Sequence, residues 1–173
     1  MRKILIFTFL IINSIFVFGQ ADWKTVNDSN YIIEYPDNWE LNKSGQMGTK
    51  FILFSKLSNS SDKFRENVNL IIQDLTGSNI ELNKYVEISE NQIKTLVTNG
   101  KIIESKRISD KGFEYHKMIY TGEQGVFDLK FIQYYWVINN KAFVLTFTAE
   151  IDEFDNYVQL ASEIMDSFKI LSK

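Results

Sequence analysis

The stretch Tyr31-Ile32-Ile33-Glu34-Tyr35-Pro36-Asp37-Asn38-Trp39 is the most informative part of the chain, and it contains the only proline of the 173 residues. Proline lacks an N–H group and fixes φ, so Pro36 ends a strand predicted over Ile32–Tyr35 and presets a turn. Trp39 is large enough to anchor the chain that follows. The stretch therefore predicts where the folded domain begins, but it supplies no chemistry.

The N-terminus has the pattern of an export signal. Arg2 and Lys3 form a short basic region, and residues 4–18 are almost all Ile, Leu, Phe or Val. A run of this length is typical of a signal peptide and is shorter than the roughly 20 residues of a membrane-spanning helix. We predict cleavage after Gly19, with residues 1–19 as the signal peptide, and a secreted or periplasmic protein. An uncleaved membrane anchor is the alternative.

The remaining composition predicts one globular domain over residues 31–173, preceded by an N-terminal extension of residues 20–30. Loss of Arg2 and Lys3 with the leader would leave 17 basic against 22 acidic residues, a formal net charge of −5. Such a chain is a poor ligand for nucleic acid or anionic membrane. No cysteine is present, which excludes disulfides, thiol catalysis and thiolate metal sites. We expect no membrane insertion after signal cleavage.

Apolar periodicity and turn residues predict a mixed α+β domain. Helices are predicted over residues 84–98, with Asn83 as cap and Asn99-Gly100 as stop, and from Asp152 or Asp155 to about Phe168. Loops are expected over residues 22–30, 42–48 and 57–65. Further strands are predicted over residues 50–56, 67–74, 101–109, 112–121, 126–138 and 141–150, the last three forming an antiparallel meander through hairpin links at 109–112, 122–125 and 139–141.

The strand over residues 126–138 is apolar on both faces in its second half, which includes Tyr134, Tyr135 and Trp136. A sheet with one wet face would alternate apolar and polar residues, so each face of this sheet must be covered. Two amphipathic helices are available as covers. The predicted fold class is α+β: a central antiparallel sheet of about six or seven strands with helices on both faces.

This order of elements resembles the PsbP-like family, from Tyr31 to Leu171. The most specific pieces are Tyr35-Pro36-Asp37-Asn38-Trp39 and the ending Ser167-Phe168. The family includes the extrinsic photosystem II protein, a nuclear import factor that binds the Ran GTPase, and secreted bacterial proteins. The resemblance implies an α/β/α sandwich that binds a larger protein partner without catalysis. Photosystem binding is not expected here, because the leader looks like an export signal.

Two groups of residues could carry chemistry. His116 is the only histidine. As a general base it would need a serine or threonine hydroxyl within reach and an acid behind it. Glu150, Asp152, Glu153 and Asp155 could bind calcium, but a calcium loop also needs a glycine turn and a distal glutamate. Acidic residues at the start of a helix also complement its dipole. We expect no cofactor, no catalytic residues and no enzyme activity.

Binding is the predicted function, with Trp39, Tyr134, Trp136 and His116 as candidate ligand or partner contacts. The leading hypothesis is an exported accessory protein that binds an envelope or extracellular protein. The alternative is a small-ligand carrier with a pocket between sheet and helix. A cavity of roughly 300 Å³ or more, lined by some of Tyr134, Trp136, Phe143 and Phe147, would favour the carrier.

Overall fold

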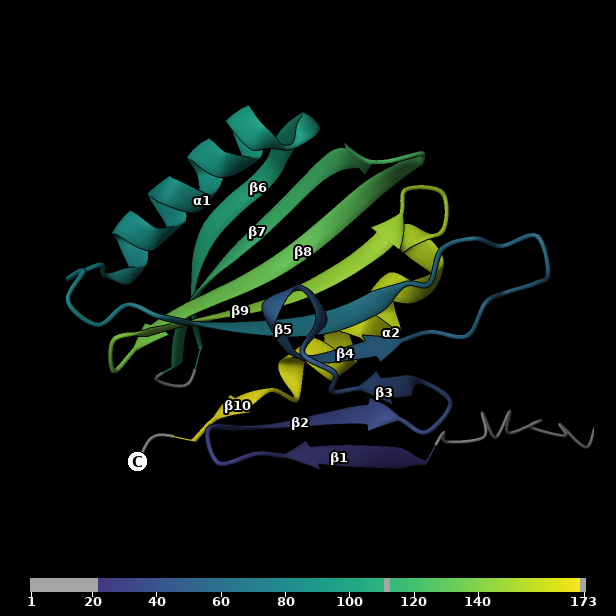
Figure 1. Ribbon diagram of the computed structural model, residues 1–173, viewed down its shortest axis with the longest axis horizontal. Helices are drawn as coiled ribbons and strands as arrows, with labels where there is room; N and C mark the ends of the chain where they lie inside the picture. The colour runs from purple at the N-terminus through teal and green to yellow at the C-terminus, as the bar shows by residue number, and fades with distance from the viewer. Residues whose placement is uncertain (1–21, 111–112, 172–173) are drawn as a thin grey trace, which may run out of the picture.

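The computed structural model describes residues 22–110 and 113–171 (Figure 1). The predicted cleavage after Gly19 and two residues of the first meander link lie outside this range. The described elements, in chain order, are β1 (Trp23–Asn27), β2 (Tyr31–Pro36), β3 (Glu40–Asn42), the 3₁₀ turn η1 (Gln46–Gly48), β4 (Thr49–Phe54), β5 (Asn67–Asp74), α1 (Leu82–Leu96), β6 (Thr98–Asp110), β7 (Phe113–Gln124), β8 (Phe127–Ile138), β9 (Lys141–Glu150), α2 (Phe154–Asp166) and β10 (Lys169–Ile170).

A seven-stranded antiparallel sheet forms the centre of the fold, in the order β3-β4-β5-β9-β8-β7-β6. Its two helices pack on opposite faces, which confirms the predicted α+β architecture. A smaller sheet, β1-β2-β10, lies beside α2 and closes the same face. Among the described residues, no helix is long and apolar enough to cross a membrane.

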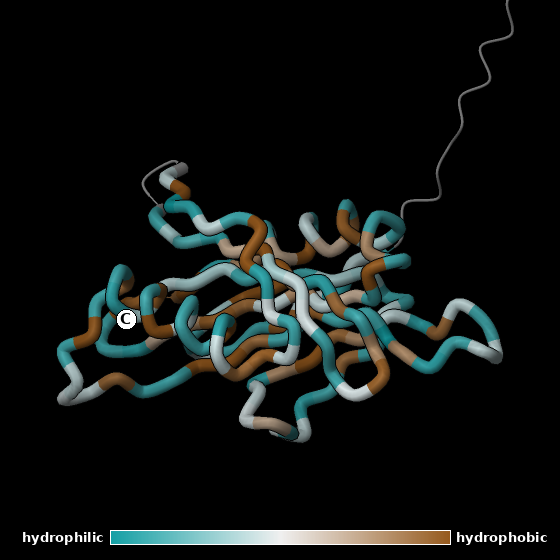
Figure 2. Tube along the Cα trace, turned by 90° about the horizontal axis from the view of Figure 1, so that it is seen from above, coloured by the Kyte–Doolittle hydropathy of each residue, from teal (hydrophilic) through white to brown (hydrophobic). Residues whose placement is uncertain are grey.

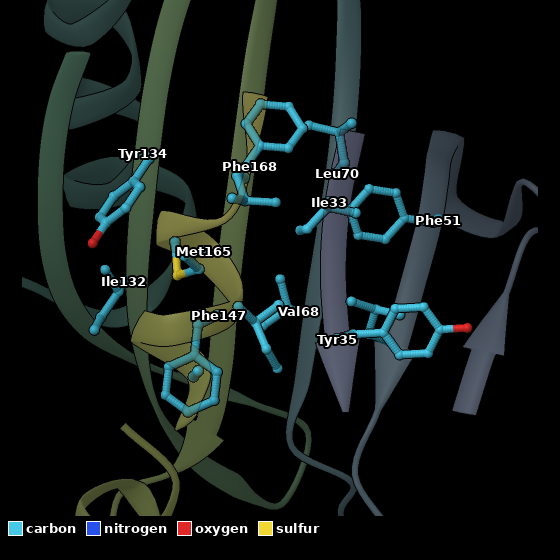
Figure 3. Packing of buried hydrophobic residues seen from close by; sticks show 14 of the residues in the cluster. Ile33, Tyr35, Phe51, Val68, Leu70, Ile132, Tyr134, Phe147, Met165 and Phe168 are labelled. Atoms are coloured by element: carbon cyan, nitrogen blue, oxygen red, sulfur yellow. The ribbon is translucent and has the colours of Figure 1, made fainter. Parts of the chain in front are cut away.

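Two cores result from the two covered faces. The larger core joins the small sheet and α2 to the central sheet, and Figure 3 shows Ile33, Phe51, Phe147 and Phe168 within it. The smaller core lies under α1, where Val86 and Ile93 meet Met118 and Tyr135. In Figure 2, apolar segments gather in the interior and hydrophilic segments occupy the loop ends.

The stretch from Tyr31 to Trp39 folds as predicted. β2 ends at Pro36, and the amide of Trp39 donates to the carbonyl of Pro36 at 3.0 Å, which closes the turn. Trp39 is only 5% exposed and belongs to the larger core. Its predicted use as an anchor is therefore confirmed.

Several local predictions are wrong. Trp23–Asn27 is not loop but strand, because it pairs antiparallel with β2. Asn83 lies inside α1, which begins at Leu82. Gly122 lies within β7 rather than in a turn, and it is buried against Val97. For Trp23–Asn27 and Gly122 the cause is a partner distant in sequence, which supplies hydrogen bonds or packing that local propensity does not register.

The meander turns follow the prediction more closely. Asn139 and Asn140 both adopt positive φ between β8 and β9, and Gly125 does so between β7 and β8. These conformations are accessible to glycine and asparagine at low cost. The turns bring Asn140 and Ile138 to one end of the sheet, beside the start of α1, where the candidate site lies.

Candidate functional site

An open groove of about 620 Å³ lies where the start of α1 meets the ends of β6, β7 and β8. Leu82 and Val137 provide apolar surface, and Glu81, Arg107 and Glu114 provide charge around it; Trp136, a residue of the larger core, also lines the hollow. Groove volumes between about 300 and 1,000 Å³ are usual for binding sites. We call this feature the α1 groove.

The charged side of the α1 groove is built by strand register. Arg107 on β6 forms an ion pair with Glu114 on β7, with its Nη2 atom 3.2 Å from a carboxylate oxygen. Arg107 is also the cross-strand partner of His116. Directly opposed residues share a face of a sheet. The α1 groove therefore opens on the same face as His116 and as the core under α1.

A second hollow of about 190 Å³ lies nearby, across the β8–β9 turn. It is lined by Asn30, Ile138, Asn139 and Phe143, and by Leu171 near the end of the described chain. Ile138 lines both hollows. The β8–β9 turn thus separates two depressions at the same end of the central sheet.

His116 meets a serine and an acid from two other elements. Its Nε2 atom lies 2.7 Å from the hydroxyl oxygen of Ser105 on β6, and that hydroxyl donates to Glu90 on α1 at 2.6 Å. Glu90 also lies 3.9 Å from Lys94 on the same helix. The three side chains join α1 to the β6–β7 hairpin, next to the α1 groove.

The order of these contacts differs from that of a catalytic triad. A serine hydroxyl has one proton, and Ser105 donates it to Glu90. The imidazole Nε2 must then donate to Ser105, whereas in a triad it accepts the proton of the serine and the acid holds the imidazole. In this protein the acid, Glu90, accepts the hydrogen bond of the serine, Ser105, instead of binding the imidazole. The geometry therefore does not activate Ser105 as a nucleophile.

We expect His116 to be a neutral Nε2–H tautomer at neutral pH. Burial lowers the pKa of His116 below 6.5 and Arg107 lowers it further, while Glu90 opposes the shift. Since the unfolded chain then binds the proton more tightly, stability should fall as pH drops through 6.5. Histidine-selective NMR should show the tautomer directly, because the chain has a single histidine.

Two variants test the order of these hydrogen bonds. Glu90→Gln removes an attractive charge and should lower the pKa of His116 further, and Ser105→Ala should weaken the tautomer preference. Glu87→Gln, on an exposed position of α1, is the matched control. A wild-type neutral form protonated on Nδ1 would contradict the assigned order of hydrogen bonds.

The predicted contact residues separate in the structure. Trp136 lines the α1 groove. His116 does not line it, but it is the cross-strand partner of Arg107, which does. Tyr134 is only 6% exposed, and its hydroxyl donates to Asp166 of α2 at 3.3 Å. Trp39 is in the larger core. The four residues expected to line a carrier pocket all belong to the larger core; of these, Trp136 also lines the α1 groove and Phe143 the smaller hollow.

The acidic residues are spread over the β9–α2 junction. Glu150 ends β9, Asp152 lies in the turn, Glu153 is the N-cap residue of α2 and Asp155 is in its first turn. Glu153 makes no side-chain cap hydrogen bond. Within residues 22–110 and 113–171, no group of three histidine, cysteine or acidic side chains is arranged to hold a metal ion.

Sequence reasoning missed Arg107, Glu114 and Glu81. A usable signal was present in the predicted hairpin link at 109–112. Counting outward from that link places residues 107 and 114 opposite each other, whereas the observed register pairs residue 107 with residue 116. The approach of the start of α1 to this hairpin has no comparable signal, because it depends on how the helix crosses the sheet.

The chain is similar to several solved structures. No family model and no curated protein matches it. Cyanobacterial PsbP (CyanoP) from Synechocystis is 16% identical, with 92% of this chain and 99% of that chain covered and a TM-score of 0.66. The chain has the PsbP-like fold.

Two other proteins share the PsbP-like fold across most of their length. LpqN of Mycobacterium tuberculosis, described as involved in cell envelope biogenesis, is 17% identical over 87% of this chain and 91% of its own, with a TM-score of 0.67. The Ran-binding protein Mog1p of Saccharomyces cerevisiae is 8% identical over 87% and 96%, with a TM-score of 0.57. The PsbP-like resemblance seen in the sequence is thus confirmed at the level of the fold.

Proposed function

We propose that this protein is an exported, non-enzymatic accessory protein that binds an extended segment of an envelope or extracellular protein in the α1 groove. The observation that carries the proposal is the groove itself: an open site of about 620 Å³ with apolar surface and a charged rim. Protein interfaces have this composition, with aromatic residues and arginine at the points that contribute most to binding.

Three further observations support the proposal. The leader has the pattern of an export signal, and LpqN, which shares the PsbP-like fold, is described as involved in cell envelope biogenesis. Mog1p, with the same fold, is a Ran-binding protein. The contact of Glu90 with Ser105 rather than with His116 is unsuited to serine hydrolysis. These points favour binding over catalysis, by analogy in the first two cases.

A pull-down comparison tests the proposal. Residues 20–173 would be immobilised and exposed to an envelope fraction, with captured proteins quantified by mass spectrometry. Arg107→Glu turns the ion pair with Glu114 into a repulsion at the groove rim, and it should reduce capture of specific partners about tenfold or more. Lys50→Glu, on an exposed position of β4, is the matched charge-reversal control.

Thermal unfolding of each variant distinguishes a loss of binding from a loss of folding. The proposal requires the same proteins to be recovered by the wild type and by Lys50→Glu, and to be lost with Arg107→Glu. Equal recovery by Arg107→Glu would place the interface elsewhere on the molecule. Absence of any reproducible partner would argue against a protein-binding function.

A small-ligand carrier is the second candidate function, because about 620 Å³ is also enough space for a small molecule. Native mass spectrometry of the protein purified from its own envelope fraction would distinguish the two. A constant mass increment that disappears on denaturation favours the carrier. The unmodified mass alone favours the accessory protein.

A further inference from the structure

Four lysines gather on the face of β6, β7 and β8 that is opposite to the α1 groove. Register places Lys101, Thr121 and Lys130 in one row across the three strands, and Lys106, Lys117 and Tyr134 in another. The row between them contains Glu104, Ile119 and Ile132. Because directly opposed residues share a face, all four lysines lie on the side of Tyr134 and α2. We call this surface the lysine face.

Helix α2 leaves the lysine face largely open. It packs against β9, β2 and β5, and Figure 1 shows it behind that half of the sheet and away from β6 and β7. Lys101 and Lys106 are exposed, and the side chain of Lys117 is 25% exposed. Lys130 lies over the ring of Phe154, with its nitrogen 3.9 Å from the ring centre. The register therefore fixes the positions of the four lysines on the paired strands.

The charge of this surface is opposite to that of the chain. Acidic residues outnumber basic ones, 22 to 19, yet the three rows contain four lysines and one glutamate. One carboxylate oxygen of Glu104 lies 3.2 Å from Nζ of Lys106 and 4.0 Å from Nζ of Lys117, so a single negative charge is shared by two ammonium groups. Lys106 and Lys117 are direct cross-strand partners, and like charges in this arrangement repel and destabilise the strand pair. Acidic residues return only in the next row, with Glu123 and Asp128.

We propose that the lysine face is a second interaction surface, which docks an acidic surface of a protein partner. Complementary charge accelerates association and selects the partner, and an added carboxylate between Lys106 and Lys117 would relieve their repulsion. A protein fits better than a lipid surface, because membrane-binding surfaces insert exposed apolar side chains beside their basic residues. Here Ile132 is buried and Ile119 half-buried between the lysine rows, and the exposed isoleucine beside them, Ile103, lies in the β6 irregularity outside the paired rows.

A decaglutamate peptide is the test probe, added to ¹⁵N-labelled protein at low salt. Backbone amide shifts should concentrate on β6, β7 and β8 and should disappear at high salt. Lys106→Glu combined with Lys117→Glu should weaken binding about tenfold or more. The matched control combines Lys24→Glu with Lys50→Glu, two exposed lysines on other elements, and should bind as the wild type does.

The results of this experiment test the lysine face independently of the α1 groove. Equal losses in the two double variants, or shifts spread over the whole chain, would show non-specific attraction and overturn the proposal. Tighter binding to vesicles of anionic lipid than to the peptide would reassign the face to a membrane. If the charge reversals unfold the protein, Lys106→Gln with Lys117→Gln replaces them. Arg107→Glu should leave peptide binding intact, so failure of the α1 groove is distinguishable.

Discussion

Replacing Gly100 with alanine should lower the free energy of unfolding by about 3 kcal/mol, at the upper end of the usual cost of overpacking. A Cβ atom on Gly100 would lie 2.3 Å from the carbonyl oxygen of Ile93 and 3.0 Å from that of Val97. Both obstructing oxygens belong to the backbone, so the end of α1 and the start of β6 would have to separate. Urea unfolding of the purified variant measures the loss.

Gly122→Ala is the informative control, because its main obstruction is a side chain. A Cβ atom there would lie 2.3 Å from Cγ1 of Val97 and 3.3 Å from the carbonyl oxygen of Thr98. Val97→Ala removes Cγ1 and should recover at least half of the stability lost in Gly122→Ala. The same change should not rescue Gly100→Ala. Equal rescue of both glycine variants would contradict the assigned obstructions.

Replacing Glu66 with glutamine should stabilise the protein at neutral pH, by an amount that grows as pH rises. Glu66 is only 2% exposed, and its carboxylate accepts a hydrogen bond from Ser55 at 3.1 Å. Burial raises the pKa of Glu66 above 4.5, and the like charges of Asp62 and Glu150 raise it further. Glutamine keeps an oxygen for Ser55 and removes the charge that burial disfavours.

The pH dependence follows from proton linkage. Because the folded-state pKa of Glu66 is raised, the folded protein binds the proton more tightly than the unfolded chain does. The stability from this group is present below about pH 4.5 and is lost as pH rises through the folded-state pKa. Urea unfolding at pH 4 and pH 8 should show a Glu66→Gln gain at pH 8 alone. Glu34→Gln, at an exposed position of β2, is the control, and an equal gain there would refute the burial argument.

The fold was largely predictable because its signals are local. Apolar runs bounded by turn residues marked the meander strands, and Pro36 marked the end of β2. Apolar character on both sides of β8 predicted two covering layers, and α1 and α2 supply them. β1 was not predictable in this way, because Trp23–Asn27 becomes a strand only by pairing with β2.

The candidate sites were predictable only in part. Trp136 stood out as an aromatic residue that could contact a ligand, and it lines the α1 groove. Arg107 and Glu114 are ordinary strand charges until the hairpin register places them together at its rim. The four lysines are likewise dispersed between residues 101 and 130, and they form one face only because β6, β7 and β8 are adjacent in the sheet.

Four features were readable from the amino-acid sequence: the α+β class, the helices on both faces, the proline turn and the PsbP-like resemblance. The individual elements depend on patterns within about twenty residues, where backbone preference and apolar periodicity act directly, and the class and the resemblance follow from the order of those elements along the chain. Three others emerge from the three-dimensional arrangement alone: which charges meet, which acid accepts the hydrogen bond of Ser105, and where the surface is hollowed. Those features depend on strand register and helix placement, which are set by packing between segments far apart in the chain.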